Sequence, residues 1–289
     1  MHRAPMIAAF RPRCYNPLAM HAIWNGDATV VRQARYSPNC WKMTVHVPSL
    51  DPIEAGQFCH ILTDFTTEPL LRRPFSYWDA VPADGGQHVD LLYTVVGKGT
   101  DILAKKQPGS KVGYMGPLGV GFTVKPVKTY VFIAGGVGIV PFYLFAKQVA
   151  AKGHKPRMIL LFGGRTQSML YGIDDFAQVG VEAQAVTEDG SRGRKGLVTH
   201  LLEEWIPKLD RTSLQLYTCG PDRMMDAVVR IARREKLPCE VSMEKHMGCA
   251  LGACGACVTR VLSDDGKDWR YSRICMEGPT YDEKCLVLE

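Results

Sequence analysis

Four cysteines near the carboxyl end of the chain have a spacing that could hold an iron–sulfur cluster. Cys249, Cys254 and Cys257 form a Cys-x4-Cys-x2-Cys motif, and Cys275 follows after seventeen intervening residues. This spacing is typical of the plant-type [2Fe–2S] ligand set. Such a cluster passes one electron at a time, so the motif predicts an electron-transfer protein.

Five small residues lie next to or between the first three of these cysteines, which favours the cluster hypothesis. Three thiolates must approach two irons while backbone amides point at the sulfurs, and only small side chains leave room for that arrangement. A structural zinc site is the alternative. Zinc ligands usually come from two separate pairs of closely spaced Cys or His residues, whereas here three cysteines share one short segment and the fourth stands alone. The small residues are Gly248, Gly252, Ala253, Gly255 and Ala256.

The other six cysteines show no paired spacing, and no secretory signal precedes them. A disulfide framework is therefore not expected. We expect these side chains to be reduced, mostly buried thiols. They are Cys14, Cys40, Cys59, Cys219, Cys239 and Cys285.

The composition is that of a globular protein with more than one domain. The chain has 289 residues, of which 46% are hydrophobic and 22% charged, and a net charge of +6. Lysine and arginine are dispersed, apart from Arg192, Arg194 and Lys195, so nucleic acid is a poor candidate ligand. A membrane span is not expected, because no apolar run reaches about eighteen residues. We expect a cytoplasmic protein.

The first half of the chain is predicted to be a small antiparallel β barrel. Residues 1–19 have no periodic pattern and are expected to be a disordered or non-native tail, and residues 20–124 are expected to form the barrel domain. Its short strands are separated by Gly, Pro and Asp turns. The expected strands are Ala28 to Arg35, Trp41 to Pro48, Gln57 to Thr63, Gln87 to Val96 and Lys111 to Met115.

From residue 125 the pattern changes to an alternation of strand and helix, which predicts a parallel sheet with crossover helices. We assign residues 125–240 to this α/β domain and residues 241–289 to a small cysteine-bearing lobe. Helices are expected from Pro141, Val198 and Pro221. The expected strands are Tyr130 to Ala134, Arg157 to Phe162, Val181 to Val186 and Leu214 to Cys219.

Two glycine-containing turns of the α/β domain are candidates for binding a dinucleotide. Gly135, Gly136 and Gly138 follow a buried strand and precede a helix, which is where backbone amides meet a phosphate. Cys219 and Gly220 end a second strand, which should lie beside the first at the ligand-binding edge of the sheet. We expect Cys219 to neighbour a nicotinamide; a small thiol packed at the end of a strand is the alternative.

The barrel carries a second group of candidate binding residues. Arg73, Pro74, Phe75 and Ser76 combine a cation for a diphosphate with a hydroxyl that could meet an isoalloxazine edge. Further along the chain, a strand leads into a glycine turn and a short helix, and an ordinary edge strand with a basic face is the alternative for both segments. The residues of the second segment are Leu92, Tyr93, Thr94, Gly99 and Thr100.

In this order, the motifs resemble those of the ferredoxin-reductase-like flavoproteins. The cysteine loop, Thr187 to Ser191 and Cys275 to Pro279 are most similar to the electron-transfer subunits of NAD-dependent dihydroorotate dehydrogenase B. The resemblance covers roughly residues 20 to 289, and the combination is more specific than any single motif. The chain departs from the family at Thr94, where a basic residue is common, and in the long interval before Cys275, which a longer hairpin around Ser263 to Gly266 would explain.

The resemblance implies three cofactors. FAD would bind at Arg73 to Ser76, Leu92 to Thr94, Gly99 and Thr100. The [2Fe–2S] cluster would bind at the four cysteines, and NAD would lie across the flavin beside Gly136 and Cys219. FAD is needed because a nicotinamide exchanges two electrons at once and the cluster one.

The resemblance also implies a partner. An FMN-containing catalytic subunit would oxidise dihydroorotate in pyrimidine (UMP) biosynthesis, and the electrons would pass through the cluster and FAD to NAD⁺. The expected assembly is a heterotetramer with two copies of each subunit. No segment of this chain has the eight strand–helix repeats of a barrel that could hold dihydroorotate, so the isolated subunit should show only NADH–dye reductase activity.

Other functions remain open at this stage. The chain could belong to an NADH-dependent ferredoxin:NADP⁺ reductase or to a sulfide or sulfur reductase. It could also be a self-contained oxidoreductase whose FAD serves a small-molecule electron acceptor and whose cluster passes electrons to a soluble ferredoxin. A non-enzymatic iron–sulfur redox sensor is a further alternative. The choice between NAD and NADP is ambiguous because Arg165 follows a strand at the position where a basic residue would favour a 2′-phosphate.

Overall fold

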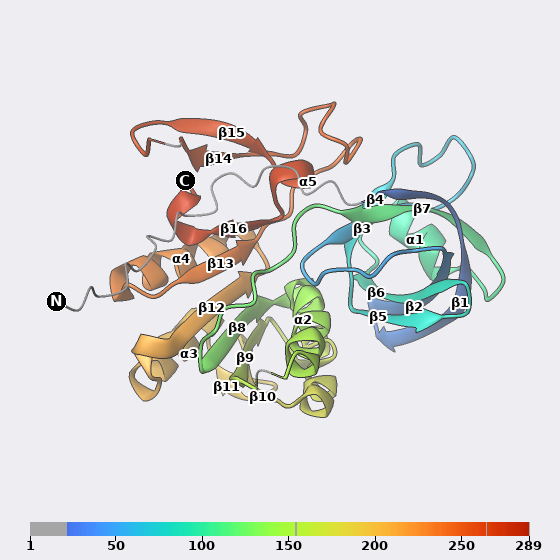
Figure 1. Ribbon diagram of the computed structural model, residues 1–289. Helices are drawn as coiled ribbons and strands as arrows, with labels where there is room; N and C mark the ends of the chain where they lie inside the picture. The colour runs from blue at the N-terminus through green and yellow to red at the C-terminus, as the bar shows by residue number, and fades with distance from the viewer. Residues whose placement is uncertain (1–21, 154, 264, 289) are drawn as a thin grey trace.

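The computed structural model describes residues 22–153, 155–263 and 265–288, so the expected tail at residues 1–19 lies outside the described residues. These residues form an antiparallel barrel sheet, a mainly parallel sheet and a two-stranded hairpin (Figure 1). The predicted combination of a β barrel, an α/β domain and a small C-terminal lobe is confirmed.

The barrel sheet has the strand order β4-β3-β7-β1-β2-β6-β5, and its pairings are antiparallel. Its strands bury alternate side chains, as Met43, Val45 and Val47 show along β2, because one face of each strand fills the barrel. Strand β5 was not predicted. The strands are β1 (Trp24–Ser37), β2 (Cys40–Pro48), β3 (Phe58–Leu62), β4 (Arg73–Ser76), β5 (Asp79–Ala83), β6 (Gly86–Thr94) and β7 (Lys111–Leu118).

The second sheet has the order β11-β10-β9-β8-β12-β13-β16, and its pairings are parallel except that of β16 with β13. Every residue of β8 is buried, as expected for a central strand covered on both faces. The predicted strands are confirmed, whereas β11, β13 and β16 were not predicted. The strands are β8 (Thr129–Gly135), β9 (Arg157–Gly164), β10 (Val181–Thr187), β11 (Arg194–Lys195), β12 (Leu214–Cys219), β13 (Cys239–Ser242) and β16 (Thr280–Asp282).

Helices α2, α3 and α4 cover the faces of this sheet and begin at or next to the predicted residues. None of the helices in the described part of the chain is long and apolar enough to cross a membrane. The helices are α1 (Lys98–Ala104), α2 (Val140–Ala151), α3 (Val198–Trp205), α4 (Asp222–Glu235) and α5 (Ile274–Glu277). Short 3₁₀ segments are Gly136–Ile139, Gln167–Met169, Ile173–Val179, Ile206–Lys208, Arg211–Ser213 and Glu283–Cys285.

The C-terminal lobe contains the hairpin β14 (Val258–Leu262) and β15 (Trp269–Arg273), followed by α5. Its turn is held by Ser263, whose amide donates to the Asp268 carbonyl at 2.8 Å. The longer hairpin predicted from Ser263 to Gly266 therefore exists, although Asp264 lies outside the described residues. The hairpin lengthens the sequence between Cys257 and Cys275 without separating the two residues, because the β14–β15 register places Val258 opposite Arg273.

Barrel and parallel sheet are packed firmly together. The Trp78 ring stacks on the Tyr143 ring of α2, with centroids 4.7 Å apart, and the Lys147 ammonium lies 2.7 Å from the Asp79 carboxylate. Stacked aromatic pairs contribute about 0.5–1.5 kcal/mol beyond the area they bury. One apolar core therefore continues from the barrel to one face of the parallel sheet, and a second joins the opposite face to the C-terminal lobe.

Candidate functional site

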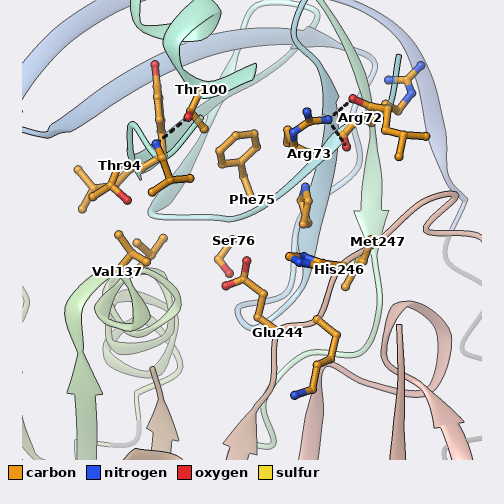
Figure 2. Close-up of a pocket in the computed structure, with 17 residues that line it drawn as sticks. Arg72, Arg73, Phe75, Ser76, Thr94, Thr100, Val137, Glu244, His246 and Met247 are labelled. Atoms are coloured by element: carbon orange, nitrogen blue, oxygen red, sulfur yellow. Dashed lines mark hydrogen bonds between the residues drawn. The ribbon is translucent and has the colours of Figure 1, made fainter. Parts of the chain in front are cut away.

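A cavity of about 630 Å³ opens on the barrel beside β4, and we call it the barrel cavity. Its size is that of a pocket for a large organic ligand. Figure 2 shows that its wall combines residues of β4 and β6 with Glu244, His246 and Met247 from the segment before the cysteine loop. The predicted residues on the wall are Arg73, Pro74, Phe75, Ser76, Leu92, Tyr93, Thr94 and Thr100.

The Arg73 side chain lies over Gly99, at the start of α1. Its Nε is 3.1 Å from the position that a Cβ on Gly99 would take, so glycine leaves room for the guanidinium. The guanidinium donates to the carbonyls of Leu71 and Arg72, and no carboxylate of the described residues pairs with it. Arg73 is thus a cation on the cavity wall, which suits an anionic group such as a diphosphate.

Thr100 stabilises the turn that enters α1. Its hydroxyl accepts a hydrogen bond from the Val96 amide at 2.9 Å and donates to the Gly97 carbonyl at 3.0 Å. The hydroxyl is therefore used within the protein, and the contribution of Thr100 is to fix the turn beside Arg73. That turn is predicted to bind a phosphate, and this role stays a prediction.

A second cavity, of about 580 Å³, lies at the carboxyl edge of the parallel sheet, and we call it the sheet-edge cavity. The two predicted glycine turns meet there. Gly138 touches the backbone of Cys219 so closely that any Cβ would overlap it, and a Cβ on Gly220 would lie 3.0 Å from the Gly135 nitrogen. The predicted residues on its wall are Gly135, Gly136, Gly138, Cys219 and Gly220.

The two cavities share part of their lining, so they adjoin each other. The shared residues come from the barrel, from the first glycine turn and from the segment before the cysteine loop. Figure 2 shows the Ser76 hydroxyl and the Glu244 carboxylate pointing toward each other on this wall. The residues common to both cavities are Ser76, Thr94, Val137, Glu244, Lys245 and His246.

Glu244 and Cys219 interact electrostatically across the sheet-edge cavity. Partial enclosure of Glu244 and the nearby charge of Asp222 raise the pKa of its carboxyl group. Burial, with the negative charge of Glu244, raises the pKa of the Cys219 thiol to about 12. Cys219 is therefore a neutral thiol at physiological pH, which fits packing against a ligand better than nucleophilic attack.

The segment Glu244–Met247 forms part of both cavity walls, and this was not predicted from the sequence. The available signal was the run of polar and charged residues placed directly between a buried strand and the cysteine loop. Loop residues that follow a strand of a parallel sheet often carry function. Met247 itself is buried, and Met243 and Met276 pack against the same apolar core, whereas Leu251 is exposed.

The four candidate cluster cysteines lie together as two pairs. Cys249 interacts with Cys254, and Cys257 interacts with Cys275. The first pair is accessible, with Cys254 exposed, and the second pair is buried. In a dinuclear cluster each iron takes two protein ligands, so this arrangement fits [2Fe–2S].

Backbone amides already point at the outer pair of thiols. The amides of Leu251 and Cys254 donate to Cys249 Sγ, each at 3.4 Å. Partial burial opposes ionisation, but these hydrogen bonds outweigh it and lower the pKa of Cys249 to about 7. Burial and the neighbouring Cys257 raise the pKa of Cys275 to about 12. Among the described residues, no three His, Cys, Asp or Glu side chains are grouped as a single metal ion requires.

A buried carboxylate connects the cysteine loop to the hairpin. Glu277 lies 2.7 Å from the Arg270 guanidinium and 3.4 Å from that of Arg273, whose other nitrogen donates to the Gly252 carbonyl at 3.3 Å. Gly252 has φ +77°, and a Cβ there would lie 2.8 Å from Met276, so only glycine fits. Glu277 thus fixes α5, and with it Cys275, against the loop.

Four of the six remaining cysteines are free thiols, as expected: Cys40, Cys59, Cys219 and Cys239. Cys14 lies outside the described residues. Cys285 is buried and disulfide-bonded, so the expectation of a reduced thiol is wrong for this residue.

Two acidic residues follow β10 and lie beside Arg165, which follows β9. The Glu188 amide donates to the Gly164 carbonyl at 3.0 Å, and the Asp189 amide donates to the Arg165 carbonyl at 3.2 Å. The backbone of two acidic residues therefore runs beside the position at which Arg165 alone had suggested a 2′-phosphate site.

Family models match two parts of the chain. The oxidoreductase NAD-binding domain matches residues 132–230, and the iron-sulfur cluster binding domain of dihydroorotate dehydrogenase B matches residues 244–287. The second match contains the four candidate cluster cysteines and begins at Glu244.

Curated relatives are similar over almost their whole length. The chain is 34% identical over 262 residues to the dihydroorotate dehydrogenase B (NAD(+)) electron transfer subunit of Lysinibacillus sphaericus, covering 90% of this chain and 97% of the relative. It is 36% identical over 238 residues to the subunit of the same name from Bacillus caldolyticus, covering 81% and 87%.

Solved structures share the fold. A structure of an NADH-dependent reduced ferredoxin-NADP oxidoreductase has a TM-score of 0.77 and 26% identity, with 90% of both chains covered. A ferredoxin NADP+ reductase from Neisseria gonorrhoeae with bound FAD and NADP has a TM-score of 0.63 and 18% identity, covering 73% of this chain and 91% of that one.

Proposed function

This chain belongs to the family of electron-transfer subunits of NAD-dependent dihydroorotate dehydrogenase B, and from that membership we propose how its sites serve one electron route. It is the oxidoreductase subunit that passes electrons from the FMN of a catalytic partner, through a [2Fe–2S] cluster and FAD, to NAD⁺ in pyrimidine biosynthesis. FAD belongs in the barrel cavity, NAD in the sheet-edge cavity and the cluster at the two cysteine pairs.

The observation that carries this proposal is the continuity of the three sites. The segment Glu244–Met247 lines the barrel cavity, and Glu244, Lys245 and His246 also line the sheet-edge cavity. Cys249 follows two residues after Met247. One short stretch of chain therefore connects the walls of both cavities with the cysteine loop, so neighbouring cofactors would lie within reach of each other.

Each part of the site has a task that follows from its chemistry. When bound, FAD supplies the conversion between a two-electron exchange with the nicotinamide and a one-electron exchange with the cluster. Arg73 would hold the FAD diphosphate, and Ser76 would orient the edge of the ring. Gly136 and Gly138 have no side chain, so the pyrophosphate of NAD could approach the protein backbone at the sheet edge. The neutral thiol of Cys219 would pack beside the nicotinamide.

The charges at the outer end of the sheet support NAD rather than NADP. Glu188 and Asp189 would repel a 2′-phosphate, and a carboxylate there can accept a hydrogen bond from a ribose hydroxyl. Steady-state rates with NADH and NADPH test this assignment. A preference for NADPH would contradict it.

We also propose that the chain is divided into three domains, one for each cofactor. Residues 20–124 would form the FAD-binding domain, residues 125–240 the NAD-binding domain and residues 241–289 the cluster lobe. The catalytic residue within this scheme is Cys219, in the sense that its side chain would touch the nicotinamide. Cys219 does not act as a nucleophile in this scheme, because no group is transferred to the protein.

The proposed partner is an FMN-containing catalytic subunit, in a cytoplasmic heterotetramer with two copies of each chain. The test is to express this chain with such a subunit and to follow NADH formation from dihydroorotate and NAD⁺ in the copurified complex. We expect turnover by the complex and only NADH–dye reduction by this chain alone. Full dihydroorotate turnover by this chain alone, or no association, would contradict the proposal.

One alternative has a specific observation in its favour. The likeness to the NADH-dependent reduced ferredoxin-NADP oxidoreductase, at a TM-score of 0.77, suits a subunit of such an enzyme as well. The two functions differ in the electron donor and acceptor. NADPH-linked reduction of ferredoxin by the copurified complex, without dihydroorotate turnover, would favour this alternative.

A further inference from the structure

Asp222 and Lys245 form an ion pair on the wall of the sheet-edge cavity, and the proposed route gives this pair no role. The Lys245 ammonium lies 2.6 Å from the Asp222 carboxylate. The two residues meet because the parallel register of β12 and β13 pairs Cys219 with Ser242, and each member of the ion pair lies three positions beyond one of these strand ends. The ion pair therefore lies at the carboxyl edge of the sheet, close to Cys219.

The wall of this cavity carries more acidic than basic side chains. Among the described residues that line it, Lys245 is the only lysine or arginine, whereas Asp222 and Glu244 are both acidic. These groups act on one another: burial and then the charge of Asp222 raise the pKa of Glu244, and burial and then the charge of Glu244 raise that of the Cys219 thiol. The charges of the wall are therefore felt at Cys219.

The nicotinamide ring changes its charge in the proposed reaction. The ring carries a positive charge in NAD⁺ and none in NADH, while the phosphates and riboses are the same in both forms. A carboxylate near the ring therefore favours NAD⁺, and an ammonium near the ring disfavours it. Because Cys219 is the proposed neighbour of the ring, the ion pair lies where its charges can distinguish the two forms.

We propose that Lys245 is a specificity-determining residue that sets the relative affinity of the sheet-edge cavity for NAD⁺ and NADH, with Asp222 as its counter-charge. The inference rests on the proposed function, which places NAD in this cavity. Asp222 and Glu244 favour the cationic ring of NAD⁺, and Lys245 limits that preference. The wall then holds neither form so tightly that one cannot replace the other during turnover.

The test measures dissociation constants for the loaded full-length protein by calorimetry at one fixed pH. The two ligands are NAD⁺ and tetrahydro-NAD, an analogue whose ring is uncharged like that of NADH but cannot donate a hydride. Neither ligand reduces the oxidised protein, so both constants are binding constants. Their ratio cancels any effect that is common to both ligands, including effects on the phosphates.

Lys245→Met and Asp222→Asn should move this ratio in opposite directions. We expect Lys245→Met to shift it about fivefold in favour of NAD⁺. Asp222→Asn should shift it about threefold in favour of tetrahydro-NAD, the smaller effect because Asp222 is the more exposed of the two side chains and solvent screens its charge more strongly. Lys245→Arg keeps the charge and should stay within about twofold of the unmodified protein.

Lys105→Met is the matched control, because Lys105 forms an ion pair with Asp101 at the same distance of 2.6 Å, outside the sheet-edge cavity. We expect the ratio to be unchanged in this variant. ADP-ribose is the control ligand, since it has the phosphates and lacks the ring. All variants should bind it within about twofold of the unmodified protein.

Any pattern other than opposite shifts in the expected directions would overturn the proposal. An ion pair that only stabilises the fold would leave the ratio unchanged in both variants. An equal loss of affinity for NAD⁺, tetrahydro-NAD and ADP-ribose in Lys245→Met would assign the lysine to the phosphates. A failure of the proposed function is recognised separately, because the unmodified protein would then bind neither NAD⁺ nor tetrahydro-NAD.

Discussion

The cysteine loop and the barrel cavity reach functional geometry by different routes. The four proposed cluster ligands lie within 27 residues, and two short elements hold them, the loop and α5. The barrel cavity is built from β4, β6, the start of α1 and the distant segment Glu244–Met247. A local site can be recognised from spacing, whereas a composite site depends on the tertiary fold. A mutation in the cysteine loop should therefore remove iron and leave FAD bound, and a mutation in the barrel cavity should do the reverse.

The largest expected effect comes from removing a cluster ligand. In Cys275→Ser the buried pair loses one thiolate, and we expect dihydroorotate-linked NAD⁺ reduction by the complex to fall by more than about a hundredfold, because changes to outer partners of a metal site already cost 10–100-fold. FAD content and NADH–dye reduction should be kept. Iron and sulfide analysis with both assays gives the measurement.

The matched control is Cys40→Ala, which removes a buried thiol of the barrel and should leave iron content unchanged. Simultaneous loss of iron and FAD in Cys275→Ser would show that the two sites do not bind their cofactors independently.

The second effect concerns the barrel cavity. Arg73→Ala removes the cation on its wall, and we expect FAD affinity to fall about 10–100-fold, since a hydrogen bond to a charged group contributes about 1.5–3 kcal/mol. Arg73→Lys should recover only part of this loss, because an ammonium cannot bind two oxygens in a fork. FAD titration followed by fluorescence measures the affinity, with iron content as the internal reference.

Lys111→Ala, an exposed change on β7, is the control for lost positive charge on the barrel. An unchanged FAD affinity in Arg73→Ala would remove the diphosphate role of this residue.

A third change tests what holds the cluster lobe together. Glu277→Gln removes the charge shared by Arg270 and Arg273, and we expect a loss of about 1–3 kcal/mol in the stability of the lobe. The measurement is the rate of iron release to a chelator, which should rise while FAD stays bound. An unchanged release rate would contradict the role given to Glu277.

The pH dependence of the lobe follows from the same residue. Burial alone would raise the pKa of Glu277, but hydrogen bonds and the charge of Arg270 outweigh it and lower this pKa below its ordinary value of 4.5. The stabilisation is therefore complete above about pH 4.5 and is lost as the pH falls through the lowered value. Iron release from the unmodified protein should accelerate in that range, and Glu277→Gln should weaken this acceleration.

The smallest expected effect lies on the wall that both cavities share. Glu244→Gln keeps the shape of the side chain and removes its charge, and we expect the NADH–dye rate to fall several-fold, equivalent to about 1 kcal/mol. Because the pKa of Glu244 is raised, the unmodified protein should show a pH inflection above the usual carboxylate range, and the variant should lack it. The measurement is the NADH–dye rate as a function of pH for the unmodified protein and for Glu244→Gln.

Glu203→Gln, a change in an exposed glutamate on α3, is the control for the loss of one negative charge. A pH inflection that persists in Glu244→Gln would assign it to another group.

The sequence was most informative where the chemistry is local. The glycine turns predicted the meeting of two turns at the carboxyl edge of the sheet, and the alternation of strand and helix predicted where the main strands lie along the chain. The cysteine spacing predicted a cluster at the loop, and this role stays a prediction. The shared wall could not be predicted, because Glu244 and Ser76 are brought together only when the C-terminal lobe packs against the barrel. Short β5, β13 and β16 were missed since they lack a repeating pattern. The role of Arg165 was ambiguous until the sheet placed Glu188 and Asp189 beside it.

The most direct test of the account is a cofactor analysis of this chain purified under anaerobic conditions, combined with absorbance spectra before and after NADH is added. The account predicts FAD, two irons and two acid-labile sulfides per chain, with flavin and cluster absorbance both bleached by NADH. Zinc or no metal in place of iron and sulfide, or a cluster that NADH leaves oxidised while the flavin is reduced, would contradict the account.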